Sequence, residues 1–236
     1  MTYGAMAVIQ LSLAAFFFFA IHGLVSATGL RGLLVGRLGE NAYRGLFSLA
    51  SAGGLAWLIM AYGHGDAGYI SLWAEFPGAR WLTIALMLPL LVMGLAGLTM
   101  KSPTAMGQEG ALADPEPARG ILRVTRHPFL CAVAGWGVLH VLVNGDLASL
   151  VLFGMLVALA INGMASIDRK RARGAGDAWA RFAVRTSRLP FLAILGGRNS
   201  LKLGEIGALR IAGGVLVWLA LLYFHGNIFG ASALPQ

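Results

Sequence analysis

The sequence predicts an all-α membrane protein, a polytopic bundle of six transmembrane helices with both termini on the periplasmic side. Of its 236 residues, 58% are hydrophobic and only 12% are charged, and the mean hydropathy is +0.74. A soluble domain of this size is not built with so few charged residues. The apolar segments and the side on which the basic residues fall then define the spans and their orientation.

Six apolar segments approach the length of about 20 residues that a helix needs to cross the hydrocarbon core. They are Ala5–Val25, Leu46–Tyr62, Trp81–Thr99, Pro128–Val143, Leu147–Ile167 and Leu209–Phe224. Two of them are short and recruit flanking residues, and Pro89 predicts a kink in the third. We therefore expect a single transmembrane domain over residues 1–236.

The basic residues indicate the orientation. Seventeen of the 18 lie in or beside three alternate loops, about residues 26–45, 100–127 and 168–208, and only Arg80 lies on the other side. The positive-inside rule places these three loops in the cytoplasm. This placement explains the net charge of +8 without a nucleic-acid partner. A single cysteine, Cys131, excludes an internal disulfide and a multi-cysteine metal site.

Two cytoplasmic loops differ in character. The segment Lys101–Ala118 is rich in proline and glycine and is expected to be mobile. The segment Asp177–Arg188 places Trp179 and Phe182 near one helical face, which predicts an amphipathic helix resting on the membrane surface. The apolar residues of Pro190–Ile194 are then expected to dip back toward the membrane.

Three of the five histidines are candidates for chemistry, because polar groups within lipid are costly and usually face a site or a partner helix. On a helix, His22 has Phe18 one turn back and the small residues Ala14 and Ala15 two turns back. His140 similarly has Trp136 one turn back. Small residues, an aromatic wall and an imidazole suit haem held between helices. The alternative is a pair of histidines that hydrogen-bond across helices.

His127 belongs to the unit Arg126-His127-Pro128, in which Pro128 suits the first turn of a helix. Arg126 lies at the expected headgroup level, where it could hold a phosphate, a propionate or a lipid. The two remaining histidines, His64 and His225, fall at outer helix ends and are expected to be interfacial.

Depth leaves the partner of His22 open. By helical rise, His22 lies about 10 Å to the cytoplasmic side of its segment's centre, and His140 about 7 Å to the other side. Axial nitrogens across one iron are only about 4 Å apart. His127 matches His22 better in depth than His140 does, so both His140 and His127 stay open as the partner of His22.

Several motifs together resemble the NnrU family over nearly the whole chain. They are Thr125-Arg126-His127-Pro128, Trp136 with His140, Asn144-Gly145-Asp146, Asp168-Arg169-Lys170-Arg171, Arg185-Thr186-Ser187-Arg188-Leu189-Pro190-Phe191 with Gly197-Arg198, His22 with Arg31, and Gly39-Glu40 with Tyr43-Arg44. The resemblance implies a bacterial inner-membrane, multi-pass protein linked with nitrite and nitric oxide respiration (denitrification). It also implies contact with the lipid bilayer, a hydrophobic small molecule or respiratory partner proteins.

The family is similar to the plant zeta-carotene cis–trans isomerase, a haem b enzyme. This similarity implies haem b as cofactor, His22 and His140 as its axial ligands, and haem-dependent isomerisation of a poly-cis carotenoid as the alternative function. The plant enzyme has a cysteine three residues before the second histidine, where this chain has Gly137.

A second resemblance belongs to another class of protein. Arg126-His127-Pro128, two helices and a charged stretch ending in Leu189-Pro190 are similar to membrane methyltransferases of isoprenylcysteine and phospholipids. Those enzymes hold S-adenosylmethionine partly with a pair of glutamates, and this chain has Asp168-Arg169 at the matching place. Methyl transfer is therefore the third hypothesis, and a structural or assembly role without catalysis is the remaining one.

Overall fold

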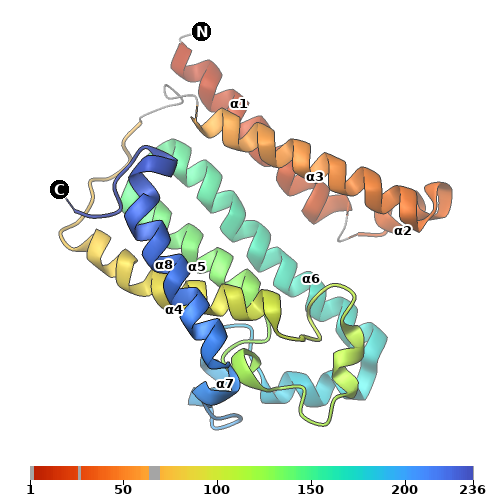
Figure 1. Ribbon diagram of the computed structural model, residues 1–236. Coiled ribbons are helices and arrows are strands. Elements are labelled where there is room, and N and C mark those ends of the chain that lie inside the picture. Colours follow the sequence, from red (N-terminus) through yellow and green to blue (C-terminus); the bar gives the residue numbers. More distant parts are fainter. Residues whose placement is uncertain (1–2, 26–27, 64–69, 236) are drawn as a thin grey trace. The chain divides into compact units, whose positions relative to one another are not determined.

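A computed structural model describes residues 3–25, 28–63 and 70–235, which are helical with connecting loops (Figure 1). The α-helices are α1 (Tyr3–Ala20), α2 (Leu30–Leu38), α3 (Glu40–Gly63), α4 (Ala79–Thr99), α5 (Pro128–Asn144), α6 (Leu147–Arg185), α7 (Leu192–Leu195) and α8 (Ala208–Phe229). A π-helical turn, η1 (Ile21–Val25), continues α1, and three short 3-10 helices lie in the loops, η2 (Glu109–Ala113), η3 (Gly120–Arg123) and η4 (Leu203–Glu205).

Five of these helices are long and apolar enough to cross a membrane. They are α1 with its π-helical end, α3, α4, α6 and α8. The fourth expected span coincides with α5, an apolar helix of 17 residues. The all-helical class and the membrane character are thus confirmed, while the sixth span and the periplasmic placement of the termini stay predictions. Pro89 lies inside α4, which continues from Ala79 to Thr99.

The chain forms two compact units that alternate along the sequence. The first unit comprises residues Met1–Pro77 and Gly137–Gly163. In it α1 and α3 pack together, and Leu58 of α3 is fully buried. A β-carbon at Gly54 would lie 2.9 Å from the ring of Phe17, so this glycine allows the two helices to approach. The core is completed by Leu11, Ala14, Ala15, Ala61 and Ala148.

The second unit comprises residues Gly78–Trp136 and Met164–Gln236. Here α8 crosses α4 in close contact (Figure 1). A β-carbon at Gly214 of α8 would lie 2.8 Å from Cα of Val92, so the two backbones nearly touch. The core of this unit consists of Met93, Ala96, Ile121, Val124, Cys131, Ala132, Met164 and Ile206.

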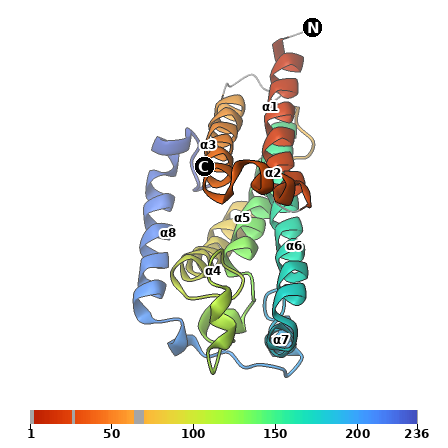
Figure 2. The same ribbon diagram turned by 90° about the vertical axis from the view of Figure 1, so that its right-hand side faces the viewer.

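The loop between α4 and α5 is folded against protein, which differs from the expected mobile loop (Figure 2). Pro103 in it is fully buried, and Arg171 of α6 donates hydrogen bonds to the carbonyls of Pro103 (2.8 Å) and Ala105 (3.2 Å). Arg171 also pairs with Glu109 at 2.7 Å. The proline and glycine content correctly indicated irregular backbone. It did not reveal that Arg171 binds this loop and holds it against α6.

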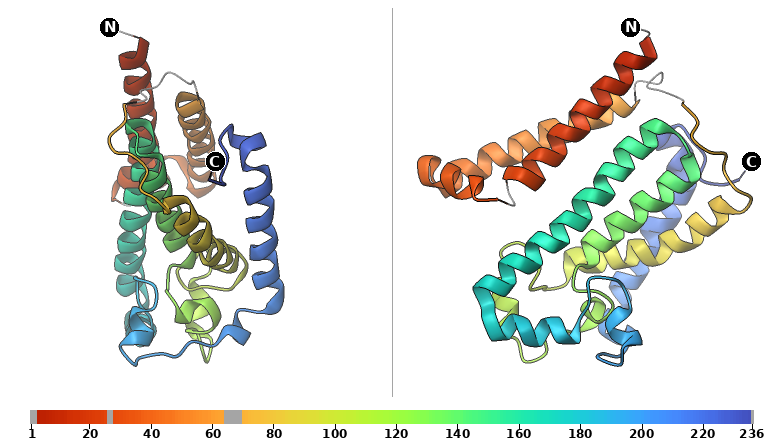
Figure 3. Two further views of the ribbon diagram at one scale, coloured as in Figure 1. Left: turned by 90° about the vertical axis from the view of Figure 1, so that its left-hand side faces the viewer. Right: turned by 180° about the vertical axis from the view of Figure 1, so that it is seen from behind.

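Helix α6 extends far beyond the expected span end at Ile167. It continues to Arg185 with a sharp turn at Gly176, where φ is 46° (Figure 3). After this turn, Trp179 and Phe182 are only 6% and 1% exposed and pack on Ala118 and Leu122. The expectation that these aromatics rest on lipid is therefore wrong. An amphipathic pattern shows that a face is covered, and here another loop of the chain covers it.

Candidate functional site

A buried carboxylate at the end of the apolar part of α6 gathers three basic side chains. Asp168 is 5% exposed. Arg126 approaches both of its oxygens, with Nη2 2.7 Å from Oδ2 and Nε 3.1 Å from Oδ1. Nε2 of His127 lies 2.7 Å from Oδ1, and Nε of Arg188 hydrogen-bonds Oδ2. We call these four residues the Asp168 cluster.

Local backbone bonds hold this cluster in place. Pro128 begins α5, so Arg126 and His127 immediately precede the first turn of that helix. The backbone N–H of Arg126 donates to the carbonyl of Ser187 at 2.9 Å. The hydroxyl of Thr125 donates to the carbonyl of Arg188 at 2.7 Å. The Arg-His-Pro segment and the segment after α6 are therefore joined by backbone as well as by charge.

The cluster retains positive charge. His127 is 2% exposed, and this burial lowers its pKa, an effect that the nearby Arg126 and Arg188 reinforce and the hydrogen bond to Asp168 opposes. This shift favours the neutral imidazole, which can donate an Nε2 proton to Asp168. Two guanidinium groups then share a single carboxylate. The guanidinium of Arg126 also lies 5.8 Å from the ring centre of Trp179, within range of a cation–π contact.

A second ion pair, between the buried Arg123 and the partly exposed Glu205, holds the same region. Nε and Nη2 of Arg123 donate to the two carboxylate oxygens of Glu205 at 2.7 and 3.0 Å. The N–H of Gly120 donates to the same carboxylate at 2.8 Å. The bond from Arg123 and then the bond from Gly120 hold the pKa of Glu205 at about 2. The pair links η3 to η4.

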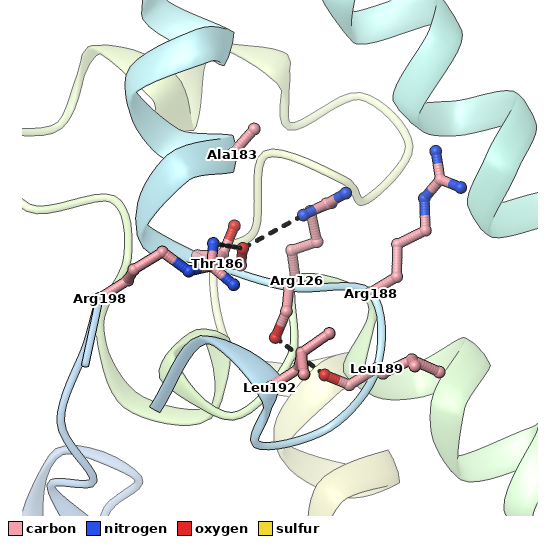
Figure 4. Close-up of a pocket in the computed structure, with 8 residues that line it drawn as sticks. Arg126, Ala183, Thr186, Arg188, Leu189, Leu192 and Arg198 are labelled. Carbon is pink, nitrogen blue, oxygen red and sulfur yellow. Dashed lines mark hydrogen bonds between the residues drawn. The ribbon is translucent and has the colours of Figure 1, made fainter. Parts of the chain in front are cut away.

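An open hollow lies beside the Asp168 cluster. It measures about 310 Å³, and its walls include Arg126, Thr186, Arg188, Leu189, Leu192 and Arg198. Figure 4 shows Arg126 and Arg198 reaching the same backbone carbonyl of Thr186, while Arg188 extends away toward α6. The structure thus groups arginine side chains from three segments around one hollow.

His22 lies in the π-helical turn at the end of α1, and such turns are frequent at functional sites. Its Nδ1 is 2.9 Å from the carbonyl of Phe18, and its Nε2 is 3.5 Å from the hydroxyl of Ser51. The ring centres of Phe18 and Phe47 are 4.4 and 5.3 Å away. Phe18 forms the expected aromatic wall. Phe47 and Ser51 on α3 were not identified from the sequence, although their spacing of one turn would place them on one helical face.

The small residues before His22 do not border open space. Ala14 and Ala15 are 0% and 4% exposed and belong to the packed core of the first unit. The alanines therefore serve the packing of the helices, and the aromatic side chains beside the imidazole are those of Phe18 and Phe47. Small residues in a sequence are compatible with close helix packing as well as with space for a ligand, and here they serve the packing.

His140 is half-buried and lies 4.8 Å from the ring centre of Phe153 on α6. A β-carbon at Gly137, one turn earlier, would be 3.0 Å from the carbonyl oxygen of Phe153 and 2.8 Å from Val157. Glycine is therefore required there for α5 and α6 to pack, and this position does not accommodate a thiol side chain without a shift. Trp136 is also half-buried and lies in the second unit.

The predicted residues thus divide between the two units. His22 and His140 belong to the first unit, whereas Arg126, His127 and Trp136 belong to the second. His225, at the end of α8, hydrogen-bonds the carbonyl of Ala231, in line with an end position, and His64 lies outside the described residues. Within residues 3–25, 28–63 and 70–235, no three His, Cys, Asp or Glu side chains converge as metal ligands. An iron held by two imidazoles needs no such group.

These features define a helical membrane protein with a buried Arg–His–Asp cluster between its polar loops. A family model described as NnrU protein matches residues 10–233, nearly the whole chain. The chain therefore belongs to the NnrU family, as its motifs indicated. No curated protein and no solved structure gave a match.

Proposed function

We propose that this NnrU-type protein is an inner-membrane, multi-pass haem b protein associated with nitrogen-oxide respiration, and that His22 and His140 are its axial ligands. The observation that carries the proposal is the way in which the ring of His22 is oriented by its neighbours. Its Nδ1 lies 2.9 Å from the Phe18 carbonyl, and its Nε2, which lies 3.5 Å from the Ser51 hydroxyl, is the nitrogen that we propose as the ligand. Metal-ligating histidines generally have their second nitrogen fixed in this way by a carbonyl or a carboxylate.

The choice of partner follows from the two units. His140 falls in the same compact unit as His22, and His127 falls in the other. His127 also uses Nε2 for Asp168, at 2.7 Å, inside a cluster where it is nearly inaccessible. We therefore propose that His140 binds the iron, and that His127 stabilises the contacts between the cytoplasmic loops through its bond to Asp168.

The residues around the two imidazoles suit an apolar macrocycle. Phe18 and Phe47 contact the ring of His22, and Phe153 contacts that of His140. Aromatic faces pack well on a flat conjugated ring. When bound, haem would supply an iron that accepts and donates single electrons and binds nitrogen oxides. The chain's part is to orient the two imidazoles and to keep water away from them.

The isomerase and methyltransferase hypotheses find less support. A β-carbon at Gly137 would meet the backbone of Phe153, so a thiol-dependent carotenoid isomerisation has no group at that position. Asp168, at the place of the methyltransferase glutamates, is already bound by Arg126, His127 and Arg188. An acid paired in this way is not available to a cationic methyl donor.

The test is the haem content of purified full-length variants. His22→Ala and His140→Ala should each abolish or grossly alter the haem spectrum, because each removes one axial ligand. His127→Ala should retain haem but lower stability, and His225→Ala, at a helix end, is the matched control. Loss of haem in His127→Ala with retention in His140→Ala would reverse the assignment. Retention in all four variants would refute haem ligation by these residues.

The respiratory association has its own readout. Addition of nitric oxide to the reduced protein should shift the Soret band, because the iron that His22 and His140 would hold can bind nitrogen oxides. A band that is unchanged by nitric oxide, in protein that holds haem, would separate haem binding from nitrogen-oxide chemistry and favour the isomerase hypothesis or an electron-transfer role.

A further inference from the structure

We propose that the hollow beside the Asp168 cluster binds the phosphate of an anionic phospholipid, held by Arg126, Arg188 and Arg198. The hollow belongs to the second unit, apart from the proposed haem ligands, so this inference does not depend on haem. Its volume of about 310 Å³ is at the lower end of the range for small-ligand pockets and suits a headgroup.

Three segments contribute arginines to the wall of the hollow, and the guanidinium groups of two of them, Arg126 and Arg198, meet at one carbonyl. Arg126 precedes α5, Arg188 follows α6 and Arg198 follows α7. Nη1 of Arg126 and Nη1 of Arg198 lie 3.4 and 3.3 Å from the same Thr186 carbonyl, so the two groups meet across the hollow (Figure 4). Planar guanidinium groups that converge in this manner are suited to bind phosphate oxygens through paired hydrogen bonds.

The charge of the hollow calls for an anion. Asp168 is the carboxylate that pairs with Arg126 and Arg188. Arg198 donates to the carbonyls of Val184 (2.7 Å) and Thr186, and no ion pair involves it in the part of the chain that the structure describes. The wall of the hollow thus contains three guanidinium groups, and one carboxylate, that of Asp168, pairs with two of them. A phosphate would compensate the excess.

The flank of the hollow is apolar and exposed, which favours a lipid over a soluble phosphate compound. Leu189 and Leu192 line it and are 64% and 49% exposed, and Leu195 beyond them is 82% exposed. Phe191 has a left-handed backbone, φ 66°, that a residue with a β-carbon rarely adopts. This bend starts α7 and so places its leucines beside the arginines.

The position of the cluster along the chain agrees with this occupant. Asp168 directly follows the apolar part of α6, and Arg126 directly precedes the apolar helix α5. Both therefore lie where apolar helical segments end, and we expect such ends at the level of phospholipid phosphates. Basic pockets at such ends attract acidic lipids, with about 1 kcal/mol, or a factor of about five in affinity, for each basic residue.

The experiment uses the full-length protein, stripped of lipid in neutral detergent. Phosphatidylglycerol is titrated by native mass spectrometry against zwitterionic phosphatidylcholine, and inorganic phosphate and pyrophosphate serve as soluble competitors. Phosphatidylglycerol should bind preferentially, with one lipid retained per chain. Millimolar phosphate should compete only weakly, because it lacks acyl chains to lie on the leucines.

Arg198→Gln should lower the affinity for phosphatidylglycerol about fivefold, and because Arg198 is exposed the fold should be retained. Arg181→Gln removes another exposed charge, on α6 and outside the hollow, and should have no such effect. Equal losses in the two variants would mean diffuse attraction and overturn the site. Displacement by soluble phosphate at comparable concentration would overturn the lipid assignment, and absence of selective binding would overturn both.

Discussion

Asp168 is the residue whose environment accounts for most of the polar contacts around the Arg-His-Pro segment. Its carboxylate is buried and accepts hydrogen bonds from Arg126, His127 and Arg188. Removing one partner of a buried charged network leaves the others without compensation, which is more costly than the network is worth as a whole. The balance of this cluster therefore depends on one negative charge.

Asp168→Asn should lower the free energy of unfolding by about 3–5 kcal/mol, because the arginines then keep their charges without a carboxylate. Asp177→Asn, on the exposed end of the same helix, is the control and should change stability little. Denaturation of the purified variants in detergent, followed by circular dichroism, measures both. Equal stability of Asp168→Asn and the parent would show that solvent, and not Asp168, balances the arginines.

Some residues of the Asp168 cluster could be identified from the sequence, but the contacts between them could not. Arg126 and His127 were candidates because they precede an apolar helix at a proline. Asp168 was noted as an acid at the head of a basic run, but it is 42 residues from Arg126 and no local spacing connects them. A single acid placed among so many basic residues at a span end was the signal that could have marked it.

Among the secondary-structure elements, the close approach of helices depends on a few glycines. The β-carbon of any other residue at Gly214 would lie 2.6 Å from Cγ2 and 2.8 Å from Cα of Val92. Backbone atoms cannot move aside as flexible side-chain ends do. Apposition of α4 and α8 is therefore specific to glycine at this position.

Gly214→Leu should destabilise the protein by about 1–3 kcal/mol through overpacking, since α8 must separate from α4. Gly226→Leu in the same helix meets no atom within 4 Å and should leave stability unchanged. Thermal unfolding of both variants provides the comparison. If the two substitutions have the same effect, the contact between α4 and α8 does not contribute to stability.

The link between η3 and η4 should depend on acidity. The folded-state pKa of Glu205 is about 2, below its usual value of 4.5, so ionised Glu205 favours the fold above pH 4.5 and this contribution is lost as the pH falls from about 4.5 to 2. Glu205→Gln should therefore be less stable than the parent at pH 6, and the difference should shrink toward pH 3. A stability difference that does not vary with pH would exclude the ion pair with Arg123 as its cause.

Helix existence and type followed from apolar length, and every expected span coincides with a helix. The ends did not follow in the same way, because polar residues can continue a helix when other segments cover them. Helix α6 shows this, with Trp179 and Phe182 covered by Ala118 and Leu122 instead of lipid. Amphipathic periodicity indicates which face of a helix is buried, but it does not indicate whether lipid or another segment of the protein buries it.

For the whole molecule, the composition was sufficient to predict the class of protein. The order of the motifs was sufficient to predict the family. The division into two interleaved units was not visible in the sequence, because each unit takes one half of α5 and one half of α6. Hydrophobicity within a helix does not change at such a boundary. The same division places His22 and His140 in one unit and His127 in the other.

Orientation is a prediction that belongs to the whole chain. If the alternate basic loops are cytoplasmic, a reporter active only in the cytoplasm should work when fused within Lys101–Ala118 and fail after Gln236. A matched periplasmic reporter, such as a secreted phosphatase, should give the opposite pattern. Activity of the cytoplasmic reporter at the C-terminus would invert the orientation and with it the expected depths of the histidines.

The central claim, that His22 and His140 hold one haem, is tested most directly by low-temperature electron paramagnetic resonance of the oxidised, purified protein. Two imidazole ligands predict a low-spin ferric signal, replaced by a high-spin signal when either histidine is changed to alanine. A high-spin signal in the unchanged protein, or absence of any haem signal after expression with ample haem, would contradict the claim.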